Sequence, residues 1–293
     1  MKYLLATPKE WKNYELLDSG NFQKLERFGK VILQRPEPQA VWAPKLPIEE
    51  WIKDFEFVQE KSHQGKWLSF SQKPTRWELV YQSSKLKLSF HLSLTNFKHV
   101  GIFPEQAVNW EYIYEACKDL YQPKVLNLFA YTGAASLAAA KGGGEVYHLD
   151  SIKQVINWAN ENAILNGLKN LHWVVEDAML FVKREVKRKK NYEGILLDPP
   201  SFGNGPKGEK WKLEEKIHEL MLYVAQLLNP KKGFLVLNCY SIGFSAIILE
   251  SILKTCFQPY QLQNLEIGEL LLLEKARNIF LPAGVFARFR YGF

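Results

Sequence analysis

From about residue 106 onward, short apolar runs alternate with longer amphipathic stretches. Runs of this length between polar segments are typical of strands buried on both faces of a parallel sheet. The alternation therefore predicts an α/β fold with a doubly wound sheet, closed by the last strand. The predicted strands are 125–128, 145–149, 172–175, 194–197, 234–238 and 284–292. The predicted helices are 107–120, 134–141, 151–166, 178–190, 213–228 and 244–255.

Residues 1–105 follow a different pattern. Polar and apolar residues alternate over 77–81 and 85–92. This pattern predicts an antiparallel hairpin with one solvent-exposed face and a turn at 82–84. We therefore expect a small strand-rich α+β domain over 1–105, followed by the α/β domain over 106–293. We expect the aromatic residues of this part to pack in its core. The alternative is that Trp42 or Trp67 stacks on a nucleic-acid base. Five of the nine tryptophans lie in this part: Trp11, Trp42, Trp51, Trp67 and Trp77.

Candidate chemistry follows the strand 194–197, where the chain reads Asp198-Pro199-Pro200-Ser201-Phe202. Ligands bind beyond the carboxyl ends of parallel strands, so Asp198 is expected to face a working crevice. The two prolines end the strand and fix the direction of the Asp198 carbonyl. This favours binding a planar amino group, with Phe202 stacking on the same ring. The alternative is a stiff turn with no ligand.

Two further acids follow strands upstream. Residues 125–136 predict a strand, a tight turn and a helix of small residues, with Gly133 as the one glycine in the turn, so a pyrophosphate cradle is not expected. Asp150 ends the next strand, where ribose hydroxyls are bound in doubly wound sheets. Asp177 follows the third strand and could accept from an adenine amino group. Either acid could instead cap a helix.

Together these segments resemble a known family. Residues 124–205 resemble class I S-adenosylmethionine-dependent methyltransferases. The runs 127–133 and 198–202 resemble those of the bacterial 23S rRNA methyltransferases that make 5-methylcytosine or 7-methylguanine. The opening segment, with Leu16-Leu17-Asp18-Ser19-Gly20 and Lys24-Leu25-Glu26-Arg27-Phe28-Gly29, is similar to a branch of that group without an evident additional N-terminal RNA-binding module. The resemblance implies a Rossmann-like seven-stranded fold and S-adenosyl-L-methionine as cofactor.

The resemblance also implies a role for individual residues. The turn would wrap the methionine part of the cofactor, Asp150 would bind its ribose, and Asp198 with Pro199 would lie near the methyl sulfonium. Asn127 stands where many relatives carry an acid, so an amide oxygen would accept from the cofactor's ammonium. The remaining cofactor contacts implied are Phe103 and Gln106 from the segment 99–106, Phe129, Tyr131, Thr132 and Gly133 in the turn, and Asp177 with Ala178 at the adenine. Pro200, Phe202, Lys207 and Lys210 are the expected substrate contacts.

Cys239 is the candidate nucleophile if the target is C5 of cytosine, which requires a thiolate to add to C6. It follows the strand 234–238, but in an ungapped comparison the relatives' cysteine falls opposite Tyr240. A one-residue slip reverses a side chain's direction, so a small buried residue is the alternative. Without a thiol, a ring or exocyclic nitrogen could attack the methyl group in line.

Composition sets the remaining bounds. The net charge of +7 and the pI near 9.1 fit a polyanionic partner. Basic residues gather at 183–190, where a solvated helix end is the alternative, and in the Gly/Lys-rich segment 203–212, expected to be a mobile loop that gates the substrate. No run of 18 apolar residues is present, and we expect a cytoplasmic protein. Three widely spaced cysteines predict neither a disulfide framework nor a zinc site.

The sequence thus predicts an S-adenosylmethionine-dependent methyltransferase acting on a base of RNA, most plausibly rRNA. Methylation of a protein side chain or a small molecule is the first alternative, and a non-catalytic module that keeps the cofactor fold is the second. The target base and the oligomeric state are left open.

Overall fold

The computed structural model describes residues 2–9, 11–60, 64–205, 208–240 and 243–293. The chain divides into two compact units. The α/β unit comprises Met1–Ala6, Val108–Leu270 and Gly284–Phe293, and the strand-rich unit comprises Thr7–Ala107 and Leu271–Ala283. Each unit is therefore built from stretches that are distant in the sequence.

Seven strands of the α/β unit form one sheet in the order β11-β10-β9-β12-β15-β17-β16, with β1 paired to β16. The first five are parallel, and β17 is antiparallel to β15. Their bounds are β1 Lys2–Ala6, β9 Lys124–Leu128, β10 Glu145–Asp150, β11 Leu171–Val175, β12 Gly194–Leu197, β15 Gly233–Cys239, β16 Glu266–Glu274 and β17 Ile279–Tyr291. The predicted seven-stranded α/β sheet is confirmed. The last strand does not close it, because β17 lies between β15 and β16.

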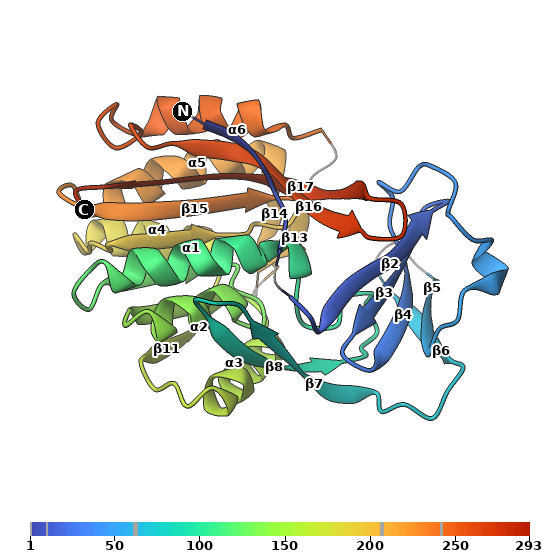
Figure 1. Ribbon diagram of the computed structural model, residues 1–293. Helices are drawn as coiled ribbons and strands as arrows, with labels where there is room; N and C mark the ends of the chain where they lie inside the picture. Colours follow the sequence, from blue (N-terminus) through green and yellow to red (C-terminus); the bar gives the residue numbers. More distant parts are fainter. Residues whose placement is uncertain (1, 10, 61–63, 206–207, 241–242) are drawn as a thin grey trace. The chain divides into compact units, whose positions relative to one another are not determined.

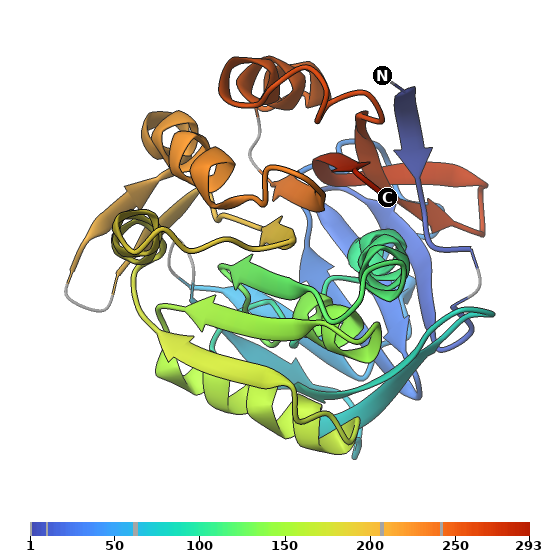
Figure 2. The same ribbon diagram turned by 90° about the vertical axis from the view of Figure 1, so that its left-hand side faces the viewer.

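Helices cover both faces of this sheet. Figures 1 and 2 show α1, α2 and α3 on one face and α4, α5 and α6 on the other. The amphipathic pattern explains the packing: in α5 the buried residues recur at helical spacing, from Leu213 through Ile217, Leu220 and Val224 to Leu227. The bounds are α1 Ala107–Lys118, α2 Ala134–Lys141, α3 Lys153–Leu165, α4 Ala178–Lys187, α5 Leu213–Leu227 and α6 Ala246–Cys256. All six predicted helices are confirmed. No helix in the described ranges is long and apolar enough to cross a membrane.

The strand-rich unit carries the strand order β2-β3-β4-β5-β6 and a separate β7-β8 pair. The predicted hairpin over 77–92 is confirmed as β7 and β8, which pair antiparallel. Two short 3₁₀ turns also occur, η1 Ile48–Glu50 and η2 Pro104–Gln106. The strands are β2 Tyr14–Gly20, β3 Gln23–Phe28, β4 Val31–Pro36, β5 Phe55–Gln59, β6 Gly65–Ser69, β7 Arg76–Gln82 and β8 Lys87–Ser93.

The tryptophans of this unit behave as structural residues. Trp11 and Trp51 are buried. The Trp42 indole donates to the Ser19 carbonyl at 3.0 Å. The Trp67 indole donates to the Thr95 carbonyl at 2.8 Å, and its ring meets that of Phe57 edge-on. These contacts favour the core interpretation of Trp42 and Trp67 over that of base-stacking platforms.

The segment 203–212 differs from the expected loop. Phe202–Asn204 (β13) and Lys210–Lys212 (β14) pair antiparallel as a small hairpin. Trp211 is buried there, and its indole donates to the Pro200 carbonyl at 2.6 Å. The glycines and lysines favour a loop locally, but burial of one aromatic residue anchors the strand that carries it.

Candidate functional site

The carboxyl ends of three neighbouring strands meet at one edge of the sheet. Leu128 of β9 is in register with Leu149 of β10 on one side and with Leu197 of β12 on the other. The residues that follow, Phe129, Asp150 and Asp198, therefore lie at the same edge. This is where ligands bind in open α/β sheets.

The turn after β9 is strained. Phe129 and Tyr131 have φ angles of 57° and 50°, and Gly133 has 93°. A left-handed conformation is a genuine outlier for bulky residues such as Phe129 and Tyr131. Such strain persists only where the surrounding structure holds it, and it clusters at ligand-binding sites. The turn 129–133 is therefore the strongest local indication of a binding site.

Gly133 fits its place for a second reason. It is the N-cap residue of α2, and a Cβ added there would lie 3.1 Å from the Ala159 Cβ of α3. The absence of a side chain lets α2 begin close against α3. Its first amide groups are thereby brought to the strand ends.

A buried polar network holds α2 on the sheet. The Asn127 amide donates to the Ser136 Oγ at 2.8 Å, and that hydroxyl lies 2.9 Å from the His148 Nδ1. Burial lowers the pKa of His148 to about 3, so its ring is neutral at physiological pH. The network joins β9, α2 and β10, which fixes the strained turn between them. With the amide nitrogen of Asn127 engaged, its oxygen stays the predicted acceptor for the cofactor's ammonium.

Asp150 also supports the turn. Its carboxylate accepts from the amide of Tyr131 at 3.0 Å and from that of Ile152 at 3.0 Å. Burial raises the pKa of Asp150, while the backbone hydrogen bonds oppose this shift. Asp150 thus positions the turn whether or not it binds a ribose.

Asp177 caps a helix. It is the N-cap residue of α4, and its Oδ1 accepts from the Leu180 amide at 2.9 Å. One of its two carboxylate oxygens therefore caps the helix, as the alternative interpretation of the sequence expected. Ala178 after it is buried. Their contacts with an adenine stay predictions.

Asp198 leads into the β13-β14 hairpin, which reaches back over the strand ends. Ser151, after β10, donates to the Asn204 carbonyl at 3.4 Å. The Phe129 and Trp211 rings lie 4.9 Å apart between centroids. The segment containing Asp198 is thus tied to the turn and to the end of β10. Pro199 is buried. Pro200 and Lys210 are exposed, and Phe202 is 59% exposed.

Cys239 lies in the core of the α/β unit. Its side chain is 1% exposed, and burial, with a contribution from the Asp198 carboxylate, raises the pKa of its thiol. A nucleophilic cysteine needs access and a lowered pKa. The structure therefore favours the buried-residue alternative for Cys239.

Three of the six basic residues in the cluster 183–190 form ion pairs within the chain. Lys183 pairs with Glu219 at 2.7 Å, Arg184 pairs with Glu176, and Arg188 pairs with Glu185. These pairs favour the solvated helix end over a phosphate-binding cluster.

Three predicted contacts have a different status. Lys207 lies outside the described residues. Phe103 and Gln106 belong to the strand-rich unit, where the Phe103 ring lies 4.9 Å from that of His99 and Gln106 is buried. Their contacts with a cofactor stay predictions.

Trp211 is a site residue that the sequence interpretation missed. The run Lys210-Trp211-Lys212 alternates exposed, buried and exposed. This period of two is the signal of a half-buried strand and was available in the sequence.

The residues at the strand ends fit S-adenosylmethionine. Gly133, where an added Cβ would crowd α3, lets the chain turn tightly beside the N-terminus of α2. A helix N-terminus favours a negative charge, here the carboxylate of the methionine part. The Asp150 carboxylate suits ribose hydroxyls. When bound there, the cofactor supplies an electrophilic methyl group.

Comparisons with known proteins agree. A family model described as S-adenosylmethionine-dependent methyltransferase matches residues 56–261. The solved SAM-dependent methyltransferase from Agrobacterium tumefaciens is 35% identical, with a TM-score of 0.89 over 99% of this chain and 96% of that one. A Streptococcus mutans structure described as a SAM-dependent methyltransferase is 17% identical, with a TM-score of 0.72 over 96% of this chain and 76% of that one, and shows the shared fold.

Among curated proteins, the chain is similar to the ribosomal RNA large subunit methyltransferase K/L of two Shewanella species. It is 35% identical to that of S. frigidimarina over 51% of this chain and 21% of that protein. It is also 35% identical to that of S. amazonensis, over 63% and 26%. The chain therefore spans about a quarter of the length of these relatives. The predicted cofactor and reaction class are confirmed: the chain belongs to the S-adenosylmethionine-dependent methyltransferase family.

Proposed function

We propose that this methyltransferase modifies a base of RNA, most specifically of ribosomal RNA, in the cytoplasm. The observation that carries the proposal is the tie between the segment after β12 and the cofactor turn, made through the Trp211 and Phe129 rings at 4.9 Å. It brings the Asp198 segment, with the exposed ring of Phe202, beside the strained turn. The names of the Shewanella relatives and the net charge of +7 support RNA as the substrate.

In this proposal the turn residues Phe129, Tyr131, Thr132 and Gly133 hold the methionine part of the cofactor, with Asn127 accepting from its ammonium. Asp150 accepts from the ribose, and Asp177 with Ala178 binds the adenine edge. Phe103 and Gln106 complete the cofactor contacts.

Asp198 and the Pro199 carbonyl would accept from an amino group of the target base and hold it in line with the methyl group. Pro200, Phe202 and Lys210 would position that base and its phosphate. The site then acts mainly by proximity and orientation. We propose a nitrogen acceptor, because the buried Cys239 thiol is poorly placed to form an adduct with C6 of cytosine.

The test is methyl transfer from labelled S-adenosylmethionine to rRNA from cells that lack this gene, followed by mass spectrometry of the nucleosides. We expect one additional methylated nucleoside with the wild type and a loss of at least a hundredfold in rate with Asp198→Asn. The matched control is Asp119→Asn, an exposed aspartate of the same unit that pairs with Arg290. Methylation of added ribosomal protein, with none of rRNA, would refute RNA as the substrate.

A further inference from the structure

The turn between β2 and β3 holds a phenylalanine where glycine is the usual residue. Gly20 pairs with Gln23, so the loop consists of Asn21 and Phe22, with φ angles of 47° and 61°. Positive φ at both central residues defines a type I′ hairpin turn, for which Asn-Gly is preferred. Asn21 fits this preference. Phe22 is strained, because a bulky side chain rarely adopts this conformation.

The backbone of this turn is pinned from outside the hairpin. The Asn21 amide donates to the Trp42 carbonyl at 2.7 Å, and the Phe22 amide donates to the Ala40 carbonyl at 2.8 Å. The Phe22 carbonyl accepts from the Glu37 amide at 2.8 Å. The ring of Phe22 is nevertheless 57% exposed. Burial of the ring therefore does not account for the strain, and the turn displays an aromatic ring on a fixed support.

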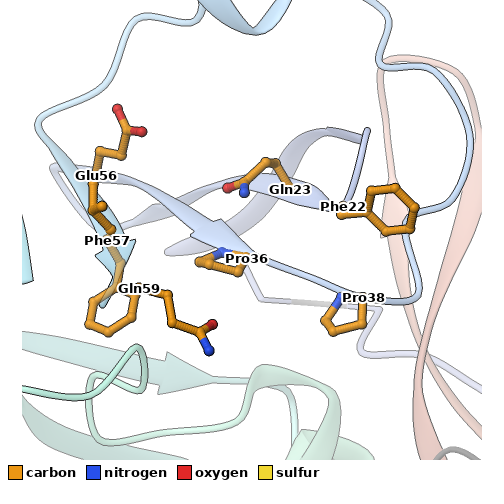
Figure 3. A pocket seen from close by; sticks show the side chains of 8 residues that line it. Phe22, Gln23, Pro36, Pro38, Glu56, Phe57 and Gln59 are labelled. Carbon is orange, nitrogen blue, oxygen red and sulfur yellow. The ribbon is translucent and has the colours of Figure 1, made fainter. Parts of the chain in front are cut away.

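Phe22 borders a pocket of about 440 Å³, shown in Figure 3. The pocket is lined by Gln23, Pro36, Pro38 and residues 56–59 of β5. The pocket forms because the pairing between β4 and β5 is short: the two strands are in register only at Leu33 with Phe55 and at Gln34 with Glu56. Pro36 has no amide hydrogen with which to continue that ladder, so the two strands separate there.

The lining suits a flat ring with a polar edge. Phe22, Pro36 and Pro38 offer apolar ring surfaces, and Gln23 carries an amide that can both donate and accept. Glu56 pairs with Lys53 at 2.9 Å. The lysine therefore reduces the repulsion between the Glu56 carboxylate and an approaching phosphate backbone. The chain's net charge of +7 favours a polyanion over a neutral ligand.

We propose that this pocket binds an unpaired base of the RNA substrate, with Phe22 as the stacking surface. The inference rests on RNA being the substrate, as proposed above. It adds a second point of recognition, in the strand-rich unit and separate from the residues that hold the reacting base.

The test measures binding of a single-stranded RNA decamer carrying 2-aminopurine, whose fluorescence is quenched on stacking. We expect Phe22→Asn to weaken binding about tenfold and to remove the quenching, since stacking of one base contributes on this scale. Asparagine tolerates the left-handed conformation, so the variant should unfold at the same or a higher urea concentration than the wild type. Phe22→Trp should restore both signals. The matched control is Tyr121→Asn, an 88% exposed aromatic residue of the α/β unit, which should leave them unchanged.

The outcomes separate the two proposals. If Phe22→Asn binds the decamer and quenches it as the wild type does, while rRNA is methylated, the pocket is refuted and the proposed function stands. If the wild type neither binds the decamer nor methylates rRNA, both are refuted. Equal affinity of the wild type for the decamer and for its fully paired duplex would also refute the pocket.

Discussion

Replacing Gly133 by alanine perturbs the site through backbone conformation and packing, and the chain offers a matched control. Gly133 and Gly143 both have φ of 93°, but a Cβ at Gly133 would lie 3.1 Å from the Ala159 Cβ, whereas a Cβ at Gly143 has no neighbour within 4 Å. The two alanine variants therefore share the conformational cost and differ in the contact.

The expected magnitudes follow from these two effects. The left-handed conformation costs an alanine about 1–2 kcal/mol, of which about 0.5–1 kcal/mol is recovered because glycine loses more chain entropy on folding. Gly143→Ala should therefore lower the free energy of unfolding by about 0–1.5 kcal/mol. Overpacking adds about 1–3 kcal/mol, so Gly133→Ala should lose about 1–4.5 kcal/mol.

Urea unfolding followed by circular dichroism measures the difference. With an m-value of about 3 kcal/mol/M, a gap of about 2 kcal/mol between the variants separates their midpoints by about 0.7 M. Calorimetric titration with S-adenosylmethionine should show weakened binding for Gly133→Ala and wild-type affinity for Gly143→Ala. Equal losses of stability in both variants would refute the packing argument, and equal affinities would remove the start of α2 from the cofactor site.

The remaining predictions concern three single residues. Asp150→Ala should weaken S-adenosylmethionine binding by about 1–3 kcal/mol in calorimetry, the scale of a lost hydrogen bond to a charged group; unchanged affinity would exclude Asp150 from the site. Because burial raises the pKa of Asp150, its carboxylate should become protonated on acidification at a higher pH than an ordinary aspartate. Cofactor affinity should then fall with decreasing pH in the wild type and stay level in Asp150→Asn over that range. The same raised pKa means that ionised Asp150 opposes folding at neutral pH and that acidification relieves this cost. Cys239→Ala should retain turnover in the rRNA assay, and complete loss with an intact fold would instead support a covalent adduct. Trp211→Phe, which keeps a ring but loses the hydrogen bond to Pro200, should lower kcat several-fold with little change in cofactor affinity, and an unchanged kcat would show that this anchor does not position the substrate.

The sequence predicts the elements of the α/β unit well because their signals are local. Short segments dominated by apolar residues mark these strands, and the Gly133 turn marks the end of the first one. The strand β16 was missed, although its four consecutive leucines, Leu270–Leu273, form a short apolar run of the same kind. Its pairing with β1 joins residues more than 260 positions apart, as Lys2 with Glu266, and local patterns carry no information about such a contact.

The candidate site shows the same limit. The sequence places Asp150, Asp177 and Asp198 after strands but does not reveal which backbone amides their oxygens accept from. That Asp150 accepts from Tyr131 depends on a turn in which two aromatic residues adopt positive φ, a conformation that propensity argues against. Burial of Cys239 likewise depends on the helices packed over β15 rather than on its neighbours in the chain.

The hairpin of β16 and β17 has a practical consequence, because its tip, Leu271–Ala283, belongs to the strand-rich unit while the bases of both strands belong to the α/β unit. No single cut of the chain can yield both units intact. A fragment beginning at residue 106 would carry this tip without β2, to which Glu274 pairs, and would leave an open strand edge prone to association. Swapping the strand-rich unit between homologues would therefore require exchanging two separate stretches of the gene together.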